Sequence, residues 1–251
     1  MKLGFWNVVK DVVRKSDVVL EMVDARFPEL TRLGVIEKYA KSCHKHLIIV
    51  LNKMDLLSSR SVQQIKNEFR NENVVFVSSK FNRNIFELIG TIKSITKKDA
   101  PTVCIIGYPN TGKSTLINKL SKGGKVRTST ESGFTRGKQL IRGRGNIMLI
   151  DTPGIVPYEA RDEIRLGLVS GISPAKLEDP ALVAFELLSI FKFRNPEALQ
   201  ASYGLDPQQE ADEMLETLAE KWNMRMKKGV IDERRAAIKL LNDWHDGVMK
   251  L

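Results

Sequence analysis

Apolar residues in the first 155 positions fall into short runs, and the segments between the runs have helical spacing. The runs have the length of buried strands and cover residues 17–23, 46–51, 74–77, 103–106 and 146–150. The intervening segments carry apolar residues every three or four positions, which predicts helices over residues 3–15, 32–41, 58–71 and 84–95. This alternation is typical of an α/β domain whose sheet is mostly parallel.

Beyond residue 159 the short apolar runs stop and helical spacing remains. Helices are predicted over 159–167, 180–193, 209–221 and 231–248, with Pro196, Gly204, Pro207 and Gly229 in the loops between them. We therefore expect an α/β domain over 1–159 and a small all-α domain over 160–251. Within the first domain, 96–101 is a polar linker that ends in proline, and Gly143-Arg144-Gly145 predicts a hairpin turn.

The sequence Gly107-Tyr108-Pro109-Asn110-Thr111-Gly112-Lys113-Ser114-Thr115 follows one predicted strand and opens a segment with helical spacing. Its pattern, G-x-x-x-x-G-K-S, is that of a phosphate-binding P-loop, which requires this strand, loop and helix context. Gly112 would let the backbone approach a phosphate, and the loop amides would point toward it. Lys113 would reach the β- and γ-phosphates, and the Ser114 hydroxyl would bind Mg²⁺. We expect residues 110–115 to bind nucleotide.

Two further segments have the composition of a guanine-reading site. Asn52-Lys53-Met54-Asp55 follows the run 46–51, and Ser78-Ser79-Lys80 follows the run 74–77. The Asp55 carboxylate can accept hydrogen bonds from guanine N1 and N2, and adenine lacks this pair of donors, which is how such sites reject analogues. Asn52 would tie its loop to the P-loop, and the Lys53 stem would cover the face of the base. The amides of Ser78, Ser79 and Lys80 would bind guanine O6.

The segment Asp151-Thr152-Pro153-Gly154 follows the run 146–150. Asp151 suits a water-mediated contact to Mg²⁺, and the amide of Gly154 suits the γ-phosphate. Each of the four patterns comes at the end of an apolar run. They therefore predict a nucleotide site at the carboxyl ends of the strands, where open α/β sheets bind ligands.

These four patterns are the set found in GTPases, but their order along the chain is rotated, because the guanine-reading segments precede the P-loop. The chain resembles the circularly permuted GTPases of the YlqF/RbgA type, a family of large-ribosomal-subunit assembly factors, and Asp24-Ala25-Arg26 also looks like that family. The resemblance implies GTP hydrolysis with GTP and GDP as ligands. It also implies a six-stranded sheet whose strands follow one another, by first residue, as 139, 146, 102, 17, 46 and 74.

The resemblance suggests further site residues. Gly133-Phe134-Thr135-Arg136 matches the family's pattern for the switch threonine, so Thr135 would bind Mg²⁺ in the GTP state, with Thr128 and Thr130 as competitors. Lys113, Thr135 and Gly154 would then act in catalysis. Asn110 stands where potassium-stimulated family members hold K⁺. Ile155 replaces the glutamine that orients water in Ras-like proteins, so we expect slow hydrolysis that depends on a partner. No histidine precedes His44, so the catalytic role of the N-terminal histidine in bacterial members is not carried over to this sequence.

Composition narrows the class of protein. Hydrophobic residues make up 42% of the chain, which is typical of a globular protein. No apolar run approaches the length needed to span a membrane, and the first residues lack the apolar core of a signal peptide. Two cysteines, Cys43 and Cys104, provide no disulfide framework, and Cys43-x-x-His46 alone is a poor zinc site. We expect a cytoplasmic protein without a membrane partner, monomeric when off the ribosome.

The net charge of +10 is unevenly distributed, with +13 over residues 1–159 and −3 over residues 160–251. Residues 119–144 hold eight basic residues against the single acid Glu131, and this segment lies where a loop would sense the γ-phosphate. Such a cluster attracts polyanions, so we expect RNA contacts; a solvated loop is the alternative. The candidate contacts are Arg136, Lys138, Arg142 and Arg144. A smaller basic spot, Arg225, Lys227 and Lys228, lies near Trp222, which is equally well explained as a core residue.

The sequence therefore predicts a GTP-hydrolysing switch that binds rRNA during assembly of the large ribosomal subunit. Two alternatives remain open. One is an RNA-binding scaffold that nucleotide stabilises but that has negligible turnover. The other is a GTPase that acts on tRNA modification or on membranes, for which the sequence offers neither a cofactor motif nor an anchor.

Overall fold

The structure is a computed structural model that describes residues 3–121, 140–150 and 162–251. Contacts divide the chain into two units, Met1–Asp55 with Val62–Tyr158, and Leu56–Ser61 with Glu159–Leu251. Several predicted site residues lie outside the described residues: Thr128, Thr130, Thr135, Arg136, Lys138, Asp151, Gly154 and Ile155. Their roles stay predictions.

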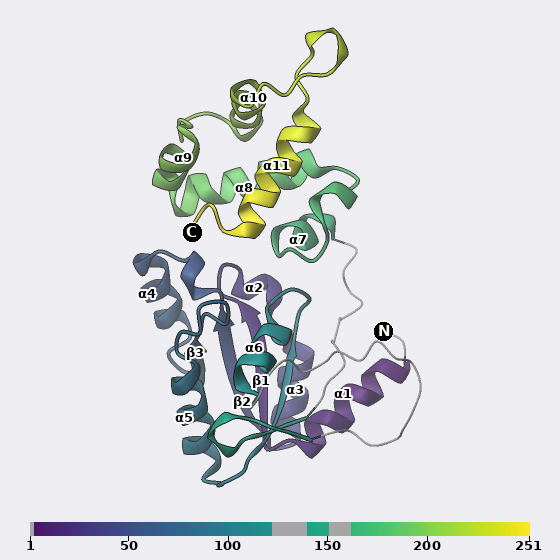
Figure 1. The fold of residues 1–251 in the computed structure, drawn as a ribbon, viewed down its shortest axis with the longest axis vertical. Helices are drawn as coiled ribbons and strands as arrows, with labels where there is room; N and C mark the ends of the chain where they lie inside the picture. Colours follow the sequence, from purple (N-terminus) through teal and green to yellow (C-terminus); the bar gives the residue numbers. More distant parts are fainter. Residues whose placement is uncertain (1–2, 122–139, 151–161) are drawn as a thin grey trace. The chain divides into compact units, whose positions relative to one another are not determined.

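The first unit contains a six-stranded sheet in the order β3-β2-β1-β4-β6-β5 (Figure 1). The strands are β1 (Val18–Asp24), β2 (His46–Asn52), β3 (Val74–Phe76), β4 (Thr102–Gly107), β5 (Leu140–Arg142) and β6 (Met148–Ile150). Neighbouring strands are parallel except β5 and β6, which pair antiparallel. The predicted α/β class and strand order are confirmed.

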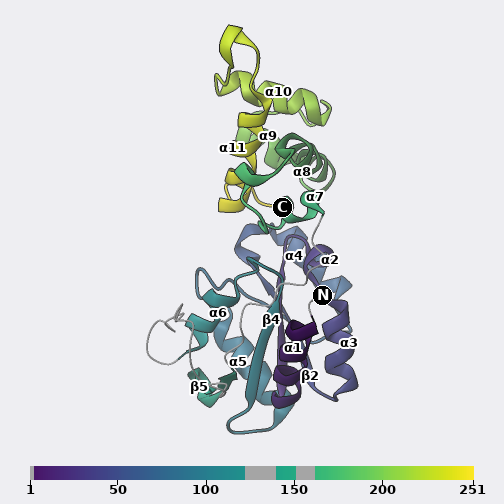
Figure 2. The same cartoon turned by 90° about the vertical axis from the view of Figure 1, so that its right-hand side faces the viewer.

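Helices cover both faces of this sheet (Figure 2). On one face lie α1 (Leu3–Lys15) and α3 (Gly34–Ser42), and on the other lie α5 (Ile85–Thr96) and α6 (Lys113–Leu120). The short α2 (Pro28–Thr31) follows β1, and α4 (Ser59–Glu68) precedes β3. Strand β1 is buried along its whole length because helices pack on both faces. Alternate residues therefore face opposite layers, and Leu20 and Met22 join the core formed with α5 and α6.

The second unit is helical. It comprises α7 (Glu163–Leu168), α8 (Pro180–Arg194), α9 (Pro196–Tyr203), α10 (Ala211–Lys221) and α11 (Glu233–Asp246). Phe191 of α8 meets Trp244 of α11 edge to face at 5.5 Å between ring centroids, and the Trp244 indole donates to the Leu168 carbonyl. Residues 56–61, which follow the guanine-reading segment 52–55, also belong to this unit. The Ser58 amide donates to the Leu251 carbonyl, and the Leu251 amide donates to the Leu56 carbonyl.

One helix differs from the sequence prediction. Pro196 and Gly204 predict a loop, but residues Pro196–Tyr203 form α9. Pro196 occupies the first turn, where its missing amide costs nothing, and Gly204 ends the helix in the left-handed conformation. Proline and glycine here mark the two ends of a helix rather than a loop.

Candidate functional site

The loops predicted to bind nucleotide lie at one edge of the sheet. Asp24 pairs in register with Asn52 where β1 and β2 end, and Met22 pairs with Gly107 where β4 ends. Because these strands are parallel, the segments that follow β2, β3 and β4 leave the sheet on the same side. Residues 52–55, 78–80 and 107–115 are therefore brought together at the edge where open α/β sheets bind ligands.

The P-loop leads from β4 into α6 around a cavity of about 260 Å³. The cavity is lined by Asn110, Gly112, Lys113, Ser114 and Thr115. Gly112 has φ +97°, and a Cβ atom there would lie 2.2 Å from the side-chain nitrogen of Asn52, so this position requires glycine. The Lys113 ammonium donates to the Tyr108 carbonyl at 2.6 Å, and burial lowers the pKa of Lys113 to about 8. A phosphate would restore a counter-charge to this desolvated lysine.

Asn52 connects the three loops. Its Nδ2 atom donates to the Thr111 carbonyl of the P-loop at 2.7 Å, and its Oδ1 atom accepts the Ser79 amide at 2.9 Å. Only 3% of Asn52 is exposed, so both hydrogen bonds are shielded from water. The tie to the P-loop that the sequence predicted is present. The second bond was not predicted, and it commits the Ser79 amide to Asn52 in this structure.

Asp24 and Arg26 hold Lys53 in place. The Asp24 carboxylate is fully buried and receives hydrogen bonds from the Arg26 guanidinium at 2.9 and 3.0 Å and from the Lys53 ammonium at 2.7 Å. Burial alone would raise the pKa of Asp24, but the charges of Arg26 and Lys53 hold it well below its usual range. Lys53 itself has φ +65°. The sequence suggested family resemblance for Asp24 and Arg26 but gave no sign of this contact.

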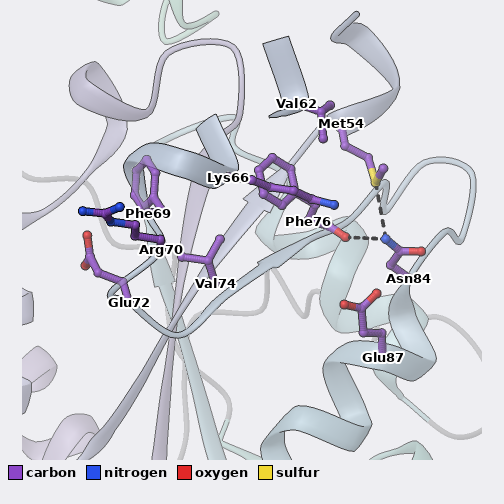
Figure 3. Close-up of a pocket in the computed structure, with 10 residues that line it drawn as sticks. All are labelled: Met54, Val62, Lys66, Phe69, Arg70, Glu72, Val74, Phe76, Asn84 and Glu87. Carbon is purple, nitrogen blue, oxygen red and sulfur yellow. Dashed lines mark hydrogen bonds between the residues drawn. The ribbon is translucent and has the colours of Figure 1, made fainter. Parts of the chain in front are cut away.

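Asn84, at the start of α5, makes a further contact to the guanine-reading loop (Figure 3). The Asn84 amide donates to the Phe76 carbonyl at 3.0 Å and contacts the Met54 sulfur at 3.7 Å. These residues belong to a pocket of about 320 Å³ beside β3, where the Lys66 ammonium lies over the Phe76 ring. Asn84 adopts φ +59° at the start of α5, a conformation that asparagine tolerates better than most residues. Its sequence context gave no functional signal.

Two of the predicted RNA contacts lie elsewhere. Arg142 ends β5 opposite Met148, where β6 begins, and its guanidinium bonds the Asn146 side chain. The Asn146 amide in turn donates to the Asp99 carbonyl, just before β4. The expectation that the basic cluster as a whole borders the γ-phosphate is therefore wrong for Arg142 and for neighbouring Arg144. The hairpin between β5 and β6 turns at the amino end of β4, and the P-loop begins at its carboxyl end.

The described residues suit a magnesium ion held mainly by nucleotide. Ser114 is exposed at the start of α6, where the P-loop pattern places a Mg²⁺ ligand. Among the described residues, no group of three or more His, Cys, Asp or Glu side chains forms a metal cage. Mg²⁺ commonly binds one or two protein ligands together with substrate phosphates, so this donor set fits. The other predicted ligands, Thr135 and Asp151, lie outside the described residues.

Two family models match the chain. The model described as "RsgA GTPase" matches residues 18–161, and the one described as "50S ribosome-binding GTPase" matches residues 102–226, starting at β4. Two structures of YlqF, one GDP-bound and the other a crystal structure of the GNP-bound protein from T. maritima, superpose with TM-scores of 0.65 and 0.66 at 26% and 27% identity. They cover 95% and 97% of this chain and 94% of YlqF.

This chain belongs to the YlqF-type circularly permuted GTPases. The rotated order of the loops is thus a family property. A GTP-binding protein of Methanocaldococcus jannaschii is 35% identical over 250 residues, covering 98% of this chain and 66% of the relative. Nucleolar GTP-binding protein 2 of Saccharomyces cerevisiae is 32% identical over 253 residues, covering 96% of this chain and 51% of the relative.

The chain spans about half to two thirds of the length of these curated relatives. Within the part of the chain that the structure describes, no helix is both long and apolar enough to cross a membrane.

Proposed function

We propose that this protein is a guanine-nucleotide switch that hydrolyses GTP and acts in assembly of the large ribosomal subunit by binding rRNA. The observation that carries the nucleotide part is the pair of hydrogen bonds made by Asn52, which join both guanine-reading loops to the P-loop. One buried side chain thereby couples the base-binding and phosphate-binding halves of the site.

The roles within the site follow from its chemistry. Asp55 accepts from guanine N1 and N2, and the Lys53 stem, fixed through Asp24, lies against the base. On nucleotide binding, Lys113 exchanges the Tyr108 carbonyl for phosphate oxygens, which compensate its charge better. Ser114 binds Mg²⁺, whose positive charge offsets charge on the phosphates during hydrolysis. Thr135, Asp151 and Gly154 complete this set in the proposal.

Asn110 is proposed to bind K⁺. It lies in the P-loop with φ +56° and lines the phosphate cavity. A K⁺ ion beside the phosphates would neutralise developing charge in the same way as an arginine finger.

The ribosomal part rests on the comparisons and on charge. One matching family model is described as a 50S ribosome-binding GTPase, and a curated relative is a nucleolar protein. The segment 119–144 is strongly basic, and within it we propose RNA contacts for Arg136, Lys138, Arg142 and Arg144. The proposal includes residues 160–251 as a helical domain, a protein that is monomeric off the ribosome, and a cytoplasmic location.

The test is GTP turnover with and without purified large ribosomal subunits, in KCl and in NaCl at equal ionic strength. The proposal expects slow basal turnover that subunits stimulate. Binding of GTP without turnover in any condition would favour the nucleotide-stabilised scaffold. If subunits neither stimulate turnover nor co-sediment with the protein, the ribosomal role is wrong and the nucleotide site stands alone.

A further inference from the structure

The edge of the sheet opposite the nucleotide site is rich in basic residues. This amino edge consists of the segments at which the parallel strands begin, residues 14–17, 41–46, 70–73, 97–102 and 142–146. Together they carry nine lysines and arginines against three acids. Two of the acids are already in ion pairs, Asp17 with Lys98 and Glu72 with Arg32. The edge therefore presents a net positive charge away from the P-loop.

Hydrogen bonds connect these segments into one continuous ribbon. The Ile49 amide donates to the Asn73 carbonyl, which links β2 to residues 70–73. The His46 amide donates to the Asp17 carbonyl, which links the start of β2 to the start of β1. The Asp17 side chain accepts from Thr102 and from Lys98, which links β1 to β4. The bonds of Asn146 to Asp99 and of Arg142 to Asn146 extend the ribbon to β5. Five strand spacings of about 4.8 Å give the ribbon a length of roughly 24 Å.

A pocket of about 270 Å³ lies at one end of the ribbon, where β2 and β3 begin. Lysine, histidine and asparagine side chains in its lining can donate hydrogen bonds; these residues are Lys41, Lys45, His46, Asn71 and Asn73. The one carboxylate in the lining, Glu72, bonds Arg32 through both of its oxygens at 2.7 and 2.9 Å. Neither Lys41 nor Lys45 has an ion-pair partner among the described residues. The pocket thus offers several donors and little competing negative charge.

Helix electrostatics explain only part of this pattern. Lysine and arginine are favourable in the last turn of a helix, near its negative end, and Arg14, Lys15 and Lys41 occupy such positions. Lys45, Lys98 and Arg142 lie outside the helices. Lys98 is offset by its ion pair with Asp17, whereas Lys45 and Arg142 have no carboxylate partner among the described residues and gain no helix-end stabilisation. A polyanion lying along the edge would supply the negative charge that these two side chains lack.

We propose that the amino edge binds RNA, with the pocket at Lys41 and Lys45 holding a backbone phosphate and the ribbon following the strand toward Arg142. This inference rests on the proposed ribosomal function, and it extends the contacts proposed there for Arg142 and Arg144 along the whole amino edge, which is separate from the nucleotide site. Because the edge is remote from the γ-phosphate, its contribution to RNA affinity is the same in the GTP and GDP states. It anchors the protein, and the nucleotide-dependent residues add to that anchor.

The test uses the whole chain and the double variant Lys41→Gln/Lys45→Gln. Binding to purified large subunits and to a 24-nucleotide single-stranded RNA is measured across a KCl series, with GDP and with a non-hydrolysable GTP analogue. We expect the slope of log K against log salt to fall by about 0.7 to 0.9, because the two lysines together hold one phosphate. The fall should be equal in both nucleotide states, and GTP turnover without RNA should match the parent.

Lys38→Gln/Lys66→Gln is the matched control, because it removes two exposed charges from the flanks of α3 and α4 and not from the amino edge. This control should keep the parent slope. If the parent binds subunits and the Lys41/Lys45 variant keeps its slope, the amino-edge assignment is overturned while the ribosomal function stands. If the parent binds neither RNA nor subunits, both proposals fail. Calorimetric binding of inorganic phosphate at micromolar affinity that depends on both lysines would instead assign a small-anion site and overturn the RNA assignment.

Discussion

Replacing Glu21 by glutamine should make the first unit less sensitive to alkaline pH. Glu21 lies in the middle of β1 with no exposed surface, and its carboxyl group accepts the Leu33 amide. Burial, and then the negative charge of Glu37, raise the pKa of Glu21 from 4.5 to about 8. Arg32 lies nearby, but its guanidinium is engaged by Glu37 and Glu72. The folded unit therefore keeps a proton on Glu21 at neutral pH.

The sign and size of the effect follow from proton linkage. The unfolded chain releases this proton above pH 4.5, whereas the folded unit retains it until about pH 8, so stability is lost as the pH rises between these values. Between pH 6 and 8 this one site should lower the free energy of unfolding by about 2 kcal/mol. Glutamine keeps the carbonyl that accepts from Leu33 and places an NH₂ group where the protonated acid carries its proton. Glu21→Gln should remove this loss.

Hydrogen exchange of the β1 amides is a suitable assay, because it reports opening of this unit and not of the helical one. Parent and variant would be compared at pH 6, 7 and 8 after correction for intrinsic exchange. Glu87→Gln makes the same chemical change at an exposed position on α5 and should leave the parent's slope unchanged. The reasoning is wrong if Glu21→Gln and the parent lose the same stability between pH 6 and 8.

Three further predictions concern the nucleotide site. Asn52→Ala should weaken GDP and GTP binding together and lower the free energy of unfolding by about 2–5 kcal/mol, because the Thr111 carbonyl and the Ser79 amide are left buried without partners. Equilibrium binding and urea unfolding measure the two effects, and unchanged GDP affinity would contradict the coupling role of Asn52. Asp55→Asn should weaken guanine binding by about 1.5–3 kcal/mol per lost hydrogen bond and shift the nucleotide preference toward XTP. Competition binding with labelled GTP and XTP measures this preference, and an undiminished preference for GTP would show that Asp55 does not recognise the base. Turnover should be faster in KCl than in NaCl, and Asn110→Ala should abolish the difference while GTP still binds; equal parent rates in the two salts would refute the potassium site.

The sequence predicted those features that have local signatures. The P-loop helix begins at Lys113 as its pattern requires, and the strand order follows from matching all four loops to one family. Contacts between distant side chains have no such signature, so the bond from Lys53 to Asp24 could not be foreseen. The position of Arg142 differs from the expectation for the basic cluster as a whole. The hairpin turn predicted at Gly143-Arg144-Gly145, taken with the predicted strand order, already implies that Arg142 lies at the amino end of β4, and the antiparallel pairing of β5 and β6 confirms this.

The rotated order of the loops also has a consequence for biosynthesis. Strands β1, β2 and β3, which adjoin one another in the sheet, are all complete by Phe76, before any of β4 has been made. The hydrogen bond between Asn52 and Ser79 joins two residues that are both made before β4. The hydrogen bond from Asn52 to Thr111 needs a residue made 32 positions after Ser79. At roughly 5–20 residues per second, this interval lasts about 2–6 s. The guanine-reading half is thus available to fold first on the nascent chain, and the ability to hold a triphosphate arrives last.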